Sequence, residues 1–150
     1  MELLRKTKQF KATIDDLKTI YTSFIRSILE FSCTVWHSGL TEENRDDFER
    51  VQKSAFQIIL GRNYKNYINA MNLLDMESLD DRRNKLCITF AKKCLKNNKT
   101  KHLFPHNKNI HSMKLRVKEP FHVIQANTER LKKSTIPHMQ RKLNEEFNYK

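Results

Sequence analysis

Glycine and proline are scarce in this chain of 150 residues, which holds 2 Gly and 3 Pro. Folds built from many short strands need tight turns, and turns depend on these two residues, so the scarcity argues against sandwiches and barrels. No glycine-rich loop is present, which excludes dinucleotide and P-loop sites. No run approaches the roughly 18 apolar residues of a membrane span, and the first ten residues have no apolar signal core. We therefore expect a helical protein with no membrane partner and no small-molecule substrate.

Cysteine is also rare, with three residues and no close pair. An odd number of separated thiols suits a reducing compartment, so we expect an intracellular protein, in the nucleus or the cytoplasm. Cys94, His102, His106 and His111 could suggest zinc, but a zinc site usually opens with a close ligand pair, which is missing. Cys87 and Cys94 are therefore expected in the core, and no metal or cofactor is expected in this chain.

The net charge of +12 is unevenly distributed. Residues 1–81 hold 11 Lys and Arg against 13 Asp and Glu, whereas residues 82–150 hold 18 against 4. A concentrated positive field favours a polyanionic partner, most often nucleic acid. A solvated lysine-rich surface without a specific partner is the alternative interpretation.

Apolar residues recur at three- and four-residue steps along the first 100 residues, which predicts helices at 2–10, 13–31, 42–60, 64–74 and 79–97. Thr41 and Ser78 are predicted N-caps, and Gly61 a left-handed residue at a helix end. The face expected to be buried in the second helix comprises Leu17, Ile20, Tyr21, Phe24, Ile25, Ile28 and Phe31.

The predicted fold is all-α: a small bundle of four to five helices over residues 1–100, followed by a basic, partly irregular tail over 101–150. Within this tail we expect an extended segment in 114–125 and a last helix at 137–147. Because the tail is basic and sparsely apolar, we expect it to order on a partner.

The helix predicted at 79–97 separates two kinds of side chain. Its apolar side is predicted to hold Leu79, Leu86, Cys87, Phe90, Ala91 and Cys94, and its other side a stripe of basic residues. Arg83 is the exception, because it points to the apolar side, where we expect it to pair with a carboxylate. The basic stripe and the tail together supply the predicted nucleic-acid contacts: Arg82, Lys85, Lys92, Lys93, Lys96, Lys99, Lys101, Lys114, Arg116, Lys118, Arg130, Lys132, Lys133, Arg141 and Lys142. Phe104, Phe121 and His122 are interleaved aromatics that could stack on bases.

No catalytic residue is predicted. Adjacent carboxylates at 15–16, 46–47 and 80–81 could hold Mg²⁺. Each pair lies at or near a predicted helix start, where capping or the helix dipole explains it. None follows the aromatic-x-Asp-Asp pattern of a polymerase palm. Cys33 and His37 lack the third member of a nucleophilic triad.

Three segments in this order and spacing resemble a known family: IYTSFIRSILEFSCTVWHSGLT (20–41), FERVQKSAFQIILG (48–61) and LDDRRNKLCITFAKKCLKN (79–97). They resemble the region that follows the catalytic core in reverse transcriptases of jockey-like non-LTR retrotransposons. The segment TERLKKSTIPHMQRKLNE (128–145) is similar to the C-terminal end of the same proteins.

The resemblance implies that this chain corresponds to the helical thumb and the segment after it. In such proteins the fingers and the palm, with its aspartates and Mg²⁺, lie upstream. The implied function of this chain is to hold the template–primer by its phosphates, without catalysis of its own. The implied partners are RNA, an RNA–DNA or DNA duplex, and the polymerase palm.

Other interpretations remain open at this point. The chain could be a helical protein–protein packing module, a non-functional remnant of an element, or, less in keeping with its pattern, a DNA-binding transcription factor. No turn in the sequence sets a recognition helix against a supporting one.

Overall fold

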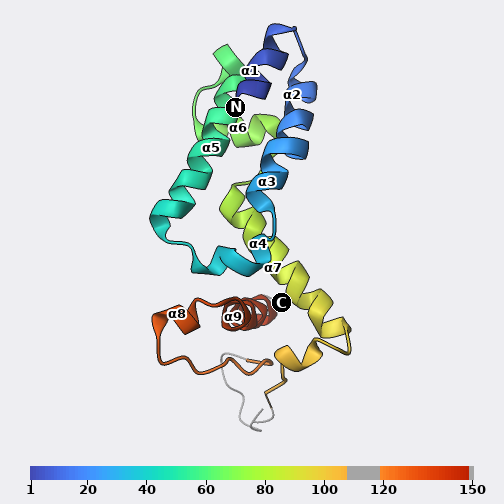
Figure 1. Cartoon of the computed structure of the whole chain (residues 1–150), viewed down its shortest axis with the longest axis vertical. Coiled ribbons are helices and arrows are strands. Elements are labelled where there is room, and N and C mark those ends of the chain that lie inside the picture. Colours follow the sequence, from blue (N-terminus) through green and yellow to red (C-terminus); the bar gives the residue numbers. More distant parts are fainter. Residues whose placement is uncertain (108–118, 149–150) are drawn as a thin grey trace. The chain divides into compact units, whose positions relative to one another are not determined.

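The structure is a computed structural model that describes residues 1–107 and 119–148. Within these ranges the chain is all-α, as expected, and the only β pairing is an isolated bridge between His106 and Phe121 (Figure 1). The α-helices are α1 (Glu2–Gln9), α2 (Ile14–Ile20), α3 (Arg26–Glu30), α4 (Cys33–Trp36), α5 (Glu42–Leu60), α6 (Tyr67–Leu74), α7 (Leu79–Lys96), α8 (Glu129–Lys132) and α9 (Thr135–Asn148). Shorter turns are η1 (Tyr21–Ile25), η2 (His37–Gly39), η3 (Gly61–Asn63) and η4 (Lys101–Leu103).

The chain divides into two compact units. Unit 1 contains Met1–Ser32 and Leu40–Arg83, and unit 2 contains Cys33–Gly39 and the described residues from Asn84 onward. Helix α7 begins in unit 1 and ends in unit 2. The boundary expected at residue 100 falls inside unit 2.

Several helix ends in unit 1 are capped by the residues that the sequence predicts. The Thr41 hydroxyl accepts a hydrogen bond from the Asn44 amide (3.2 Å) at the start of α5, and Ser78 accepts one from Asp81 (3.1 Å) at the start of α7. Both predicted N-caps are confirmed. Gly61 follows α5 with φ of 56°, a positive value that favours glycine, but its ψ of −118° differs from the left-handed helical conformation that we expected there.

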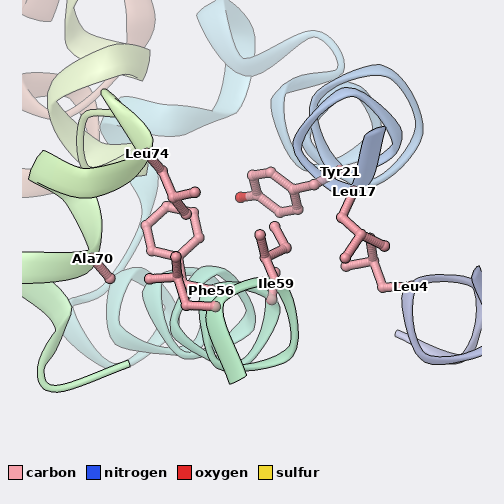
Figure 2. Packing of buried hydrophobic residues seen from close by; sticks show 9 residues of the cluster. Leu4, Leu17, Tyr21, Phe56, Ile59, Ala70 and Leu74 are labelled. Carbon is pink, nitrogen blue, oxygen red and sulfur yellow. The ribbon is translucent and has the colours of Figure 1, made fainter. Parts of the chain in front are cut away.

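The core of unit 1 is formed by side chains from α1, α2, η1, α5 and α6 (Figure 2). The Phe56 ring is fully buried, with the Tyr21 ring edge-on at 5.9 Å and the Tyr67 ring stacked at 5.8 Å between centroids. Leu4 of α1 and Leu17 of α2 close the same cluster.

A polar network centred on the fully buried Gln52 lies beside this core. The Gln52 amide accepts a hydrogen bond from the Tyr21 hydroxyl (2.7 Å) and donates to the Tyr67 hydroxyl and the Glu77 carbonyl (2.8 Å each). Burial raises the pKa of the Tyr21 phenol; burial, followed by the hydrogen bond to Glu49, raises that of Tyr67. Both phenols therefore remain neutral donors at physiological pH.

The buried face predicted for residues 13–31 is correct as far as Tyr21, and beyond it only Ile25 lies inward as predicted. Phe24, Ile28 and Phe31 are 60%, 74% and 76% exposed, whereas Ile25 packs against the core. The cause is η1, a π-helical turn between α2 and α3. A π turn takes one more residue than an α turn, so the inward face moves on by about one position.

Unit 2 corrects the expectation of an unpacked tail. Phe121, Met139 and Leu143 are buried in one cluster with Cys87, Ala91, Cys94 and Phe104. The predicted last helix is confirmed as α9. The Asn144 amide pairs with the backbone of Phe121 in both directions (3.0 and 2.9 Å), which holds a non-helical segment of the tail against α9.

We expect Phe56→Ala to lower the free energy of unfolding by about 3–5 kcal/mol, because it opens a cavity in the core of unit 1. Phe24→Ala is the matched control and should change it by about 0.5 kcal/mol or less, because that ring is mostly in water. Thermal melts followed by circular dichroism would measure both. Equal losses for the two variants would contradict the register set by η1.

We expect Gln52→Leu to destabilise the chain by about 1–3 kcal/mol, since buried hydroxyl and carbonyl groups lose their partners. The control is Gln57→Leu, on the exposed side of the same helix, which should be nearly neutral. Urea denaturation would compare them, and a neutral Gln52→Leu would show that the network does not support the fold.

Candidate nucleic-acid interface

The basic stripe lies where the register of α7 predicts it. Cys87, Ala91 and Cys94 are buried in unit 2, while Lys93 and Lys96 are exposed on the other side of the helix. The two faces follow from the helical period, since residues three and four apart share a side.

Four lysines form what we name the α7-end cluster: Lys93, Lys96, Lys99 and Lys101. All are exposed, and none makes an ion pair with another described residue. The chain between them is ordered by hydrogen bonds from the Thr100 hydroxyl to the Cys94 carbonyl and from the Lys101 amide to the Asn97 carbonyl (2.9 Å each). The cluster is therefore a set of unneutralised charges on a defined backbone.

The surroundings of the α7-end cluster in the sequence strengthen its field. From Arg82 to Lys118 there is no Asp or Glu. Lysine near a helix C-terminus also complements the helix dipole. Lys93 and Lys96 would serve the helix in this way, but Lys99 and Lys101 lie beyond its end.

Two predicted contacts of the stripe have partners inside the protein. The Arg82 Nε lies 2.6 Å from the Glu30 Oε1 within unit 1, and the Lys92 Nζ lies 2.6 Å from the Glu146 Oε1 within unit 2. Their charges are locally balanced, so they are weaker candidates for phosphate contact. Lys85 is exposed.

Arg83 is buried, as the sequence predicts. Its guanidinium carbon lies over the ring of Phe48, 4.6 Å from the centroid. This cation–π contact is one interaction of the buried guanidinium, and the carboxylate pair that we expected there stays a prediction.

The predicted contacts in the tail are divided. Lys114, Arg116 and Lys118 lie outside the described residues. Lys132 pairs with Glu129 (3.3 Å), Lys142 pairs with Glu145 (2.8 Å), and the Arg141 guanidinium donates to the Lys132 carbonyl. Arg130 and Lys133 are exposed without an ion pair in the described chain.

The aromatic part of the prediction is wrong for two residues. Phe104 and Phe121 are 1% and 2% exposed, because the tail folds over them, so neither ring can receive a base. His122 is exposed. Phe90, which we expected in the core, is 44% exposed and lies one turn before Lys93.

The paired carboxylates have structural roles. Asp16 forms the capping box of α2 with Thr13. Hydrogen bonds from the Thr13 side chain and backbone to its carboxylate lower the pKa of Asp16. Asp47 pairs with Arg50 (2.8 Å), and Asp80 pairs with Arg45 (2.7 Å). Across residues 1–107 and 119–148, His, Cys, Asp and Glu form no group of three that could hold a metal ion.

None of the helices that the structure describes combines the length and the apolar character needed to cross a membrane. Comparison of the chain with protein-family models, curated proteins and solved structures finds no match. The functional interpretation therefore depends on the residues and their arrangement.

Proposed function

We propose that this chain binds nucleic acid as the thumb-like, non-catalytic C-terminal part of an RNA-directed DNA polymerase of a jockey-like non-LTR retrotransposon. The observation that carries the binding proposal is the α7-end cluster, four exposed lysines that form no ion pair with a described residue, in a stretch of sequence free of acidic residues. The resemblance of residues 20–61 and 79–97 to such proteins carries the assignment to a polymerase.

The proposed mechanism is electrostatic. Lysine ammonium groups neutralise backbone phosphates and release condensed counterions, which gives affinity without reading the base sequence. An RNA–DNA hybrid is recognised mostly by its shape and backbone, so this surface suits it. The chain would hold the template–primer for an active site, with its Mg²⁺, in the polymerase palm.

A second function is favoured by one observation in unit 1. Phe24, Ile28 and Phe31 expose an apolar line along η1 and α3. Large apolar side chains in water often mark a protein interface. The chain would then be a helical packing module, and it would self-associate or bind a protein without affinity for nucleic acid.

The test is the double variant Lys93→Gln with Lys96→Gln in the full chain. We expect it to weaken binding to a fluorescent 20-base-pair RNA–DNA hybrid by about tenfold or more in 0.1 M salt, since two phosphate contacts are lost. Fluorescence anisotropy measures the dissociation constant. Lys92 is left unchanged because its charge is paired with Glu146.

The matched control is Lys18→Gln with Arg50→Gln, which removes the same charge from α2 and α5. It should lose much less affinity, because neither residue belongs to the predicted contacts. If the two double variants bind alike, the α7-end cluster is not the binding surface. Self-association of a wild-type chain that does not bind the hybrid would favour the packing module.

A further inference from the structure

Unit 1 is electrically polarised although its total charge is balanced. It contains 13 Lys and Arg and 13 Asp and Glu. Residues 1–11 and 57–67 together hold six of the basic residues and a single acidic one, Glu2. These two stretches are far apart in sequence but belong to α1 and to the end of α5, which pack against each other. The nearly equal numbers of acidic and basic residues in the first half of the sequence conceal this local excess of positive charge.

Lys8 joins the two stretches. Its ammonium group donates to the Ile58 carbonyl and to the Ile59 carbonyl (3.3 Å) near the C-terminus of α5. The last carbonyls of a helix carry partial negative charge, which repels anions. Because the Lys8 ammonium group binds these carbonyls, its positive charge offsets their partial negative charge, and this end of α5 no longer repels an anion.

Gly61 leaves room for this contact. A Cβ atom at position 61 would lie 2.7 Å from the Lys8 Nζ, and φ of 56° disfavours other residues there. The approach of Lys8 to the end of α5 thus depends on glycine for two reasons, space and backbone conformation.

Beside Lys8 the surface is hollowed. A depression of about 380 Å³ is lined by Arg5, Lys8, Gln9, Gln57 and Ile58, with no acidic residue. Arg5 is exposed, as is Arg62, which directly follows Gly61, and neither makes an ion pair within the described chain. Guanidinium and amide groups are the donors that bind phosphate oxygens. We name the polar residues of this depression, together with Arg62 just after the end of α5, the α1–α5 patch: Arg5, Lys8, Gln9, Gln57 and Arg62.

We propose that the α1–α5 patch is a second contact for the nucleic-acid backbone, separate from the α7-end cluster. The proposal rests on the proposed function for the identity of the partner. Its own support is two arginines that form no ion pair among the described residues, the amide donors and the contact of Lys8 with the end of α5. Each neutralised phosphate adds to the affinity, so loss of the patch should weaken binding by the whole chain.

The experiment compares Arg5→Gln with Arg62→Gln against the control Lys18→Gln with Arg50→Gln, both in the full chain. The probe is the same 20-base-pair hybrid in 0.1 M salt, measured by anisotropy. We expect the patch variant to bind about tenfold more weakly than the control, and circular dichroism should show an unchanged fold for both. Lys8 is not substituted, because its contact with α5 is structural.

The outcomes separate this proposal from the proposed function. If the patch variant binds like the control while Lys93→Gln with Lys96→Gln binds weakly, the patch proposal is wrong and the proposed function stands. If only the patch variant binds weakly, the nucleic acid is held by unit 1, and the α7-end cluster is not its site. If the wild-type chain does not bind the hybrid, both are wrong.

Discussion

Gln52 connects α5 to its neighbours in unit 1 through hydrogen bonds made inside the core. Its amide reaches Tyr21 of η1, Tyr67 of α6 and the backbone of Glu77 just before α7. Tyr67 in turn donates to the carboxylate of Glu49, whose other oxygen accepts from the Asp80 amide (2.9 Å) at the start of α7. Because buried polar groups are costly without partners, the network favours this arrangement of the helices, in which these groups are paired.

This network bears on function through α7. In unit 1, Glu49 accepts a hydrogen bond from the first turn of the helix, and Asp80 of that turn pairs with Arg45. The carboxylates at this N-terminus therefore already have partners. The other end belongs to unit 2, where Lys92 pairs with Glu146 but Lys93 and Lys96 form no ion pair with a described residue. At the N-terminus of α7 the charges are paired and support the fold. At its C-terminus the lysine charges remain available, so only this end is suited to bind phosphates.

Much of this arrangement follows from local sequence rules. The N-caps Thr41 and Ser78, the glycine after α5 and the buried side of α7 depend on spacing alone, so they could be predicted. The π turn at residues 21–25 could not, because no local residue type specifies it, and it moved Phe24 into water. The pairing of Lys92 with Glu146 and the burial of Phe121 arise from contacts distant in sequence. For that reason the sequence shows where the basic residues lie, but it does not show which of them form ion pairs.

The central claim is that exposed lysines and arginines, which form no ion pair within the described part of the chain, bind nucleic-acid phosphates. The most direct measurement is the affinity of the unmodified chain for an RNA–DNA hybrid across a series of salt concentrations. Neutralisation of about six phosphates predicts that the logarithm of the binding constant falls with the logarithm of salt at a slope of roughly −4 to −5. A flat response, or no binding at low salt, would contradict the account.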